Sequence, residues 1–361
     1  MHFFGFLEQL SFWPQMAAWL VVLLVVAFII SKACNYFEGA ADYLGRHFPP
    51  GVKGATVNAA GSSMPELLSA VALLFFLHSA DSFGAGIALT AGSAIFNSVF
   101  IPLCVVVAVM VSFRLGVVVW AAQRKEITLC KASIIRDGTA LIVSEIVLIL
   151  LLSKTMLTWV DGAILVGLYI PYVFYMWWQS RNHRNVGVDE ENQKFTPMSA
   201  WGVLLISVAI LVVACHALAE SVIGTANMFG VNPFITAIFL GAAASSVPDT
   251  ILSVKDARKG KEDDAIANAV GSNTFDICIA LGLPLMVYGL MYGPVEMPSH
   301  DGIQVLRIAL VFITVSVLAL FLIPKRVKLW HAYCLGLLYL GWIFFAMNAE
   351  FRWIDVNLDL F

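Results

Sequence analysis

Two stretches of this chain place carboxylates, hydroxyls and a proline inside otherwise apolar sequence. The first reads Gly61-Ser62-Ser63-Met64-Pro65-Glu66, and the second reads Ala244-Ser245-Ser246-Val247-Pro248-Asp249. A carboxylate at bilayer depth is costly unless something offsets it, which marks a functional site. Proline removes the hydrogen bond to the carbonyl four residues earlier and leaves a bare backbone oxygen beside the side-chain oxygens. Oxygen ligands at a helix break are what a hard cation such as sodium or calcium needs.

A second pair of motifs follows these stretches. Gly92-Ser93-Ala94-Ile95-Phe96-Asn97 lies downstream of the first, and Gly271-Ser272-Asn273-Thr274-Phe275-Asp276 lies downstream of the second. Glu66 and Asp249 are 183 positions apart, and Asn97 and Asp276 are 179 positions apart. Two different motifs in the same order, at nearly equal offset, indicate an internal duplication.

The composition indicates a multi-pass helical membrane protein. Hydrophobic residues make up 60% of the 361 residues and charged residues only 12%, whereas a soluble globular chain carries about 25% charge. Several apolar runs exceed the roughly 20 residues that span a bilayer. The net charge of −3 gives no indication of a nucleic-acid partner. We expect ten transmembrane helices, at residues 16–45, 52–77, 84–111, 130–152, 158–178, 199–228, 232–256, 263–291, 302–322 and 330–348.

The longest polar stretch, Ser180–Pro197, falls between the fifth and sixth of these spans. An odd number of helices per half makes the two copies enter the membrane from opposite sides, which is the inverted-repeat architecture of many secondary transporters. We therefore expect an all-α polytopic fold with ten transmembrane helices. A first five-helix repeat would occupy residues 1–179, a cytoplasmic linker 180–198 and a second five-helix repeat 199–361.

The basic residues predict the orientation. The loops on one side of the ten spans hold 17 of the 21 lysines and arginines, and the opposite side holds Lys154, Arg307 and Arg352. By the positive-inside rule the richer side is cytoplasmic, so both termini are expected on the non-cytoplasmic face. We expect the protein in a plasma membrane or bacterial inner membrane, with the lipid bilayer as its surroundings.

In this topology the polar motifs meet near the bilayer midplane, between the repeats. Glu66 and Asp249 would be the two permanent charges, and together they could balance one divalent cation, or monovalent cations that compete for the same oxygens. Neutral oxygens would come from Ser62, Ser63, Ser93, Ser245, Ser246 and Ser272. Ser93 and Asn97 are four residues apart, as are Ser272 and Asp276, so each pair shares a helix face. This mixture suits calcium better than magnesium, and no His/Cys cluster suggests zinc or copper.

The motifs resemble the two α-repeats of the cation/calcium antiporter superfamily, the sodium/calcium exchangers, and most of all its potassium-dependent sodium/calcium branch. The resemblance covers residues 52–112 (the first motif region) and 232–290 (the second). It implies ion ligation by Ser62, Ser63, Glu66, Ser93, Asn97, Ser245, Ser246, Asp249, Ser272 and Asp276, together with the backbone carbonyls of Ala59 and Ala242. It also links the position of Asp276 to potassium dependence or to protonation. Ala244-Ser245 departs from the Gly-Thr usual there, which bears on ion preference.

These observations predict a secondary active antiporter that moves Ca²⁺ against Na⁺, with K⁺ or H⁺ as possible further ions and no cofactor. The alternative is a Ca²⁺/H⁺ or other divalent cation/H⁺ antiporter. Proton exchangers of the superfamily usually show a GNxxE-type motif, which is absent here, although Asp276 leaves room for protons. A channel would also need buried carboxylates but rarely arises as inverted five-helix repeats. We do not expect an enzyme, because no nucleophile–base pair, Gly-x-Asp protease pair or HExxH motif is found.

Overall fold

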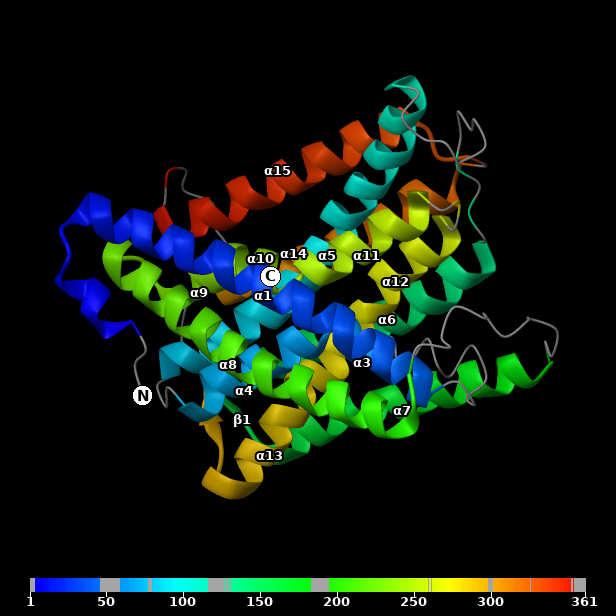
Figure 1. Cartoon of the computed structure of the whole chain (residues 1–361). Helices are drawn as coiled ribbons and strands as arrows, with labels where there is room; N and C mark the ends of the chain where they lie inside the picture. The colour runs from blue at the N-terminus through cyan, green and yellow to red at the C-terminus, as the bar shows by residue number, and fades with distance from the viewer. Residues whose placement is uncertain are drawn as a thin grey trace.

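A computed structural model describes residues 4–45, 59–76, 80–115, 127, 129, 131–182, 195–258, 260, 262–297, 301–324, 326–351 and 353. The chain forms a bundle of long helices, several of them interrupted (Figure 1). The helices are α1 (Phe12–Leu44), α3 (Ala59–Ser62), α4 (Met64–Phe76), α5 (Ala80–Leu115), α6 (Lys131–Leu151), α7 (Trp159–Asn182), α8 (Pro197–Phe229), α9 (Pro233–Thr236), α10 (Ala242–Ser245), α11 (Val247–Arg258), α12 (Glu262–Phe275), α13 (Gly282–Tyr292), α14 (Asp301–Leu322) and α15 (Leu329–Phe351).

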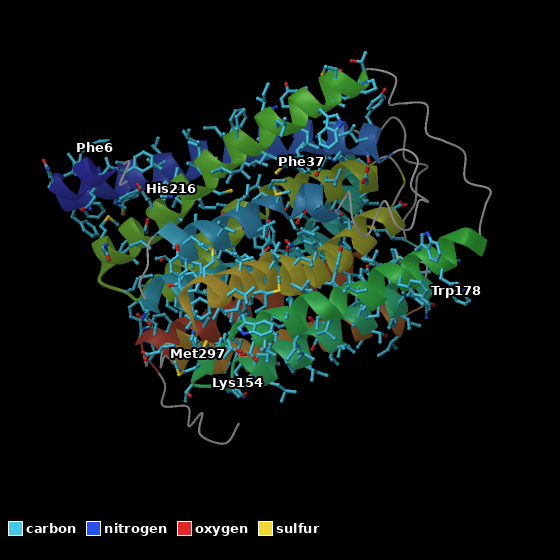
Figure 2. All side chains as sticks on the ribbon, turned by 90° about the horizontal axis from the view of Figure 1, so that it is seen from below. Phe6, Phe37, Lys154, Trp178, His216 and Met297 are labelled. Carbon is cyan, nitrogen blue, oxygen red and sulfur yellow. The ribbon has the colours of Figure 1, made fainter. Side chains whose placement is uncertain are left out.

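Shorter elements complete the described chain. A 3₁₀ turn, η1 (Gly5–Gln9), precedes α1, and two π-helical segments, η4 (Ala237–Gly241) and η5 (Asp276–Leu281), continue α9 and α12. The strands β1 (Met156–Leu157) and β2 (Val295–Glu296) pair antiparallel. They tie together two turns at one end of the bundle, where Lys154 and Met297 lie close to each other (Figure 2).

The described residues contain seven helices that are long and apolar enough to cross a membrane, and an eighth if the bent α9–α11 segment counts as one span. Two further predicted spans fail this test for different reasons. The apolar part of α4 is short, Met64–Phe75, and α6 carries Arg136, Asp137 and Glu145 within 21 residues. The multi-pass helical class is therefore confirmed. Most of the predicted linker at 180–198 and the first part of the predicted span at 52–77 lie outside the described residues.

The centre of the bundle is α5, which packs against α4, α11, α12, α14 and α15. In an apolar 18-residue window of α5, 72% of the residues are buried, compared with 28% in the corresponding window of α15. Small residues allow this close packing, because they let helix backbones approach one another. A Cβ atom added at Gly92 would lie 2.7 Å from the carbonyl oxygen of Ile238 in η4. The second motif of the first half therefore lies directly against the second half.

Both proline-containing motifs interrupt their helices, as the sequence predicts. Ser63 separates α3 from α4, and Ser246 separates α10 from α11, where the helix axis bends by 42°. Each interruption lies two residues before a proline, Pro65 or Pro248, whose missing N–H cannot bond the carbonyl four residues earlier. The helical pattern resumes immediately, with Leu67 N donating to Ser63 O and Thr250 N donating to Ser246 O. The breaks thus bring serine hydroxyls and backbone oxygens together inside the bundle.

Candidate cation-binding site

Four segments converge at the predicted site: the α3/α4 break, α5, the α10/α11 break, and the junction of α12 with η5. The structure buries every serine, asparagine and acidic side chain predicted for the site, namely Ser62, Ser63, Glu66, Ser93, Asn97, Ser245, Ser246, Asp249, Ser272 and Asp276. All of them are at most 2% exposed. Burying so many polar groups together is favourable only if they find partners in one another or in a ligand.

Ser93 lies at the centre of this cluster. Its Oγ is 3.0 Å from Glu66 Oε1, 2.7 Å from Ser246 Oγ and 3.4 Å from Asp276 Oδ2. Ser246 Oγ in turn lies 3.2 Å from the same Glu66 Oε1. A hydroxyl carries a single proton, so Ser93 cannot donate to both carboxylates at once. The cluster therefore has more acceptors than donors.

Asn97 lies between the two acidic residues that the second half contributes to the site. Its Nδ2 lies 3.3 Å from Asp249 Oδ2 and 3.4 Å from Asp276 Oδ2. Further contacts cross between the halves, with Ser62 beside Asp249 and Ser245 beside Glu66. Each half of the chain thus supplies hydroxyl or amide groups to the carboxylates of the other half.

Several buried oxygens of the cluster have no hydrogen-bond partner. They are Ser63 Oγ, Glu66 Oε2, Asn97 Oδ1, Asp249 Oδ1 and Asp276 Oδ1. An unpaired buried carboxylate oxygen carries a large desolvation penalty. Because the missing partners must be positive or donate hydrogen bonds, a bound cation or proton fits this set of oxygens. The acceptor excess is the main chemical property of the site.

The site would not hold a metal ion on charged side chains alone. Within the described chain, no group of three or more His, Cys, Asp or Glu residues gathers closely enough to do so. A cation would need hydroxyl, amide or carbonyl oxygens in addition, as calcium and sodium sites commonly have. Such a donor set suits an ion that must be released as well as bound.

The two predicted backbone ligands, Ala59 and Ala242, each begin a short helix before a motif break. Ala59 is the first residue of α3. The carbonyl of Ala242 accepts hydrogen bonds from Ser246 N and Ser245 Oγ, both at 3.1 Å. Since a carbonyl has two lone pairs, both are engaged in this conformation. Ala242 would have to exchange one of these bonds to take part in ion binding.

Sequence reasoning missed two asparagines of the second half. Asn268 lies beside Asp249, and Asn273 donates from Nδ2 to Ala94 O at 2.9 Å and to Ser98 Oγ at 2.7 Å. Asn268 has a sequence signal, because it precedes Ser272 by four residues and so shares the helix face of Ser272 and Asp276. Asn273 has no such signal, since its partners lie in another helix.

A further acidic residue lies buried but apart from the cluster. Glu145 in α6 is 1% exposed, and its Oε1 accepts a hydrogen bond from Thr314 of α14 at 2.6 Å. The hydrogen-bond partner of Oε1 belongs to α14 and not to a motif segment, while Glu145, like the cluster carboxylates, has one oxygen, Oε2, without a partner. Glu145 therefore provides an internal comparison for the acidic residues of the cluster.

Comparisons with known proteins identify the family. The family model "Sodium/calcium exchanger protein" matches residues 18–178 and 199–348. The chain is 29% identical over 202 residues to sodium/potassium/calcium exchanger 2 of Gallus gallus, covering 53% of this chain and 27% of that protein. It is 26% identical over 301 residues to the inner membrane protein YrbG of Escherichia coli K12, covering 81% of this chain and 86% of that one. The chain thus spans about a quarter of the chicken exchanger and most of the bacterial protein.

Solved structures share the fold. The H⁺/Ca²⁺ exchanger CAX superposes with a TM-score of 0.70 at 14% identity, covering 92% of this chain and 88% of that one. The sodium–calcium exchanger NCX_Mj superposes with a TM-score of 0.57 at 20% identity, covering 90% and 97% of the two chains. At these sequence identities, the structural similarity shows only that the architecture is shared. Together with the family model, which matches most of the length, it places this multi-pass membrane protein in the sodium/calcium exchanger family.

Proposed function

We propose that the chain is a secondary active antiporter that exchanges Ca²⁺ for Na⁺ at the cluster around Ser93. The observation that carries this proposal is the set of buried carboxylate oxygens without partners on Glu66, Asp249 and Asp276. The sodium/potassium/calcium exchangers among the relatives support the choice of ions. The transported ions are substrates, and no cofactor is needed for exchange.

Competition for one site would couple the two fluxes. Either Ca²⁺ or Na⁺ ions would neutralise Glu66 and Asp249, and the two kinds of ion would not be held together. An empty site keeps uncompensated charge inside the bundle, which opposes reorientation of that site through the low-dielectric interior. A neutralised site can reorient, so each ion moves in one direction only when the other moves back. This accounts for antiport without any chemical step.

The proposal includes the full architecture. The ten helical segments would form two inverted five-helix repeats, at 1–179 and 199–361, joined by a cytoplasmic linker at 180–198. Both termini would lie on the non-cytoplasmic side of a plasma or inner membrane. This arrangement is supported by the contacts between the halves, in which a serine of each half lies beside a carboxylate of the other half. Cysteine accessibility at both termini would test it. Labelling of both from the cytoplasmic side would contradict the proposed orientation, and labelling of the two from opposite sides would contradict two five-helix repeats.

The second candidate function is Ca²⁺/H⁺ exchange. Glu66 and Asp249 already balance the charge of one Ca²⁺ or of two Na⁺ ions, so the third buried carboxylate, Asp276, is available for a proton. The fold shared with the H⁺/Ca²⁺ exchanger CAX also favours this candidate. K⁺ at Asp276 is the corresponding option within sodium-coupled exchange. In all these cases Glu66 and Asp249 keep the same role.

Uptake of calcium-45 into proteoliposomes distinguishes the candidates. We expect uptake only when sodium is loaded inside, with a further increase if external potassium is cotransported with calcium. Uptake driven by a proton gradient without sodium would replace the first candidate by the second. Absence of calcium uptake under all three conditions would overturn both. The Glu145→Gln variant serves as a matched control, because it removes a buried carboxylate whose hydrogen bond goes to Thr314 of α14.

A further inference from the structure

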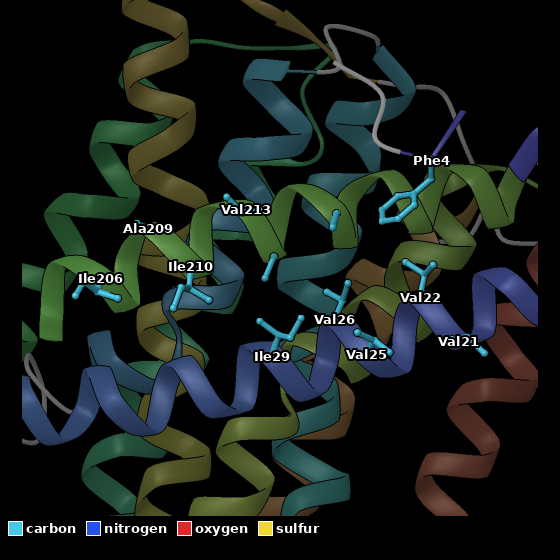
Figure 3. Close-up of a pocket in the computed structure, with 12 residues that line it drawn as sticks. Phe4, Val21, Val22, Val25, Val26, Ile29, Ile206, Ala209, Ile210 and Val213 are labelled. Atoms are coloured by element: carbon cyan, nitrogen blue, oxygen red, sulfur yellow. The ribbon is translucent and has the colours of Figure 1, made fainter. Parts of the chain in front are cut away.

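An apolar groove runs along the outside of the α1/α8 pair. The two helices lie side by side and antiparallel, with side chains of both turned toward the gap (Figure 3). The groove encloses about 700 Å³ and is lined by apolar residues, among them Val22, Val25 and Ile29 of α1 and Ile206, Ile210 and Val213 of α8. Its shape is long and narrow, since it follows the seam between two helices.

The groove continues at one end into a second hollow of about 400 Å³. The two hollows share Ile29, Ile206 and Ile210, and the second one reaches Lys32 and Tyr36. The Lys32 side chain is exposed, with Nζ 5.5 Å from the centre of the Phe28 ring. None of the ion pairs found in the described part of the chain includes Lys32. One end of an otherwise apolar groove therefore carries a phenol and a lysine that has no ion pair among the described residues.

The opposite end of the groove is closed by the N-terminal segment. Phe4 lines the groove there (Figure 3), its ring packs edge-on against Trp19 at 5.9 Å, and its backbone N–H donates to Glu220 Oε2. Between Val21 and Lys32 the groove follows about 16 Å of helix. One leaflet of a hydrocarbon core about 30 Å thick has nearly the same depth. The groove thus matches the length of one acyl chain, with a positive charge where its headgroup would lie.

We propose that this groove is a binding site for an anionic phospholipid. One acyl chain lies between Val22, Ile29 and Ile210, and the phosphate pairs with Lys32 Nζ and accepts a hydrogen bond from the Tyr36 hydroxyl. A lysine stem buried along apolar surface with its ammonium at the headgroup level is a stable arrangement in membranes. In the proposed orientation the Lys32 end of the groove would face the cytoplasmic leaflet, whereas the site itself does not depend on transport.

The test measures retained lipid on the whole protein purified in detergent. Phosphatidylglycerol or phosphatidylcholine is added, and bound lipid is counted by native mass spectrometry. We expect the wild type to prefer phosphatidylglycerol. Lys32→Gln should lower this preference about fivefold, since one basic residue near a charged lipid surface contributes a change of that size. Lys32→Arg should restore it, because the positive charge is kept.

A second variant tests the groove without touching the charge. Ala209→Trp fills the groove from α8 and should reduce retention of the lipid, whereas Leu337→Trp adds the same ring to the lipid-facing side of α15, where Leu337 is 70% exposed, and should not. Equal retention by the wild type, Lys32→Gln and Ala209→Trp would overturn the proposal, as would dimers found in place of lipid. Because retention is measured without ion gradients, this failure would leave the calcium-uptake result unaffected.

Discussion

The two halves of the cation site share their serines, proline and carboxylate but end their second motif on different residues. Each half has a serine pair, a proline and a carboxylate at a helix break, followed by a serine one turn before the final residue. That residue is Asn97 in the first half and Asp276 in the second. Asn97 donates toward Asp249 and Asp276, whereas Asp276 only accepts. The asymmetry removes one negative charge from the site and supplies a donor to hold the remaining carboxylates together.

The equivalence of the two halves predicts the largest effect. Glu66→Gln and Asp249→Asn should each reduce sodium-dependent calcium uptake by about 100-fold or more, because leaving a buried charge half-compensated costs about 3 kcal/mol or more. Calcium-45 uptake into proteoliposomes measures this. A loss in only one variant would mean that the halves are not equivalent.

Glu145→Gln is the control for this pair. Glu145 is nearly as buried as Glu66 but bonds to Thr314 of α14, so uptake should stay close to that of the wild type. Equal losses in all three variants would indicate damage to the fold rather than to a cation site, and would contradict the assignment.

Asp276→Asn makes the two halves match at the residue where they differ. We expect calcium uptake to persist, since Glu66 and Asp249 remain, but its dependence on potassium or pH should weaken. In the proposed mechanism a proton or a potassium ion binds at Asp276. Uptake by the wild type should therefore fall more steeply than uptake by the variant as pH drops from 8 to 6. Complete loss of uptake in Asp276→Asn would instead make Asp276 an essential calcium ligand.

Local features of the cluster could be predicted from the sequence more readily than the packing of the helices around it. The breaks at Ser63 and Ser246 follow from a proline two residues later, whose missing N–H acts locally. The pairing of Ser93 with Asn97 follows from helical spacing. These features depend on neighbours in the chain, so a single sequence suffices to find them.

Features that depend on tertiary packing were not predictable in this way. The π-helical segments η4 and η5 leave no mark in an apolar run, because one extra residue per turn does not change its composition. Asn273 was missed because its partners, Ala94 and Ser98, lie in α5. The N-terminal contact of Phe4 with Trp19 was missed for the same reason.

The motif glycines sharpen the comparison between the halves. A Cβ at Gly92 would lie 2.7 Å from the Ile238 carbonyl oxygen, whereas at Gly271 the nearest atom is the Tyr172 hydroxyl oxygen at 3.6 Å. Gly92→Ala should therefore destabilise the protein by about 1–3 kcal/mol through overpacking against backbone, and Gly271→Ala should be tolerated. Thermal unfolding of the two variants in detergent measures the difference. Similar melting temperatures would show that α5 and η4 are not packed as closely as described.

The smallest expected effect concerns Asn273, whose counterpart in the first half is Ala94. Asn273→Ala removes the hydrogen bonds from Nδ2 to Ala94 O and Ser98 Oγ, at a net cost of about 1 kcal/mol each. It also removes the buried Asn273 Oδ1, which has no partner, so part of this cost is offset. We expect a decrease in melting temperature of a few degrees at most, with calcium uptake unchanged, because Asn273 links α12 to α5 without contacting the carboxylates.

Ser98→Ala provides the matched second variant. It removes only the acceptor of one of these bonds, so the double variant should cost less than the sum of the two single variants. This non-additivity separates a specific Asn273–Ser98 contact from general loosening of the bundle. A strictly additive result would mean that the two side chains act independently, and a change in calcium affinity would mean that Asn273 belongs to the ion site after all. The second of these results would mean that the two halves of the ion site differ at this motif position as well as at the last one.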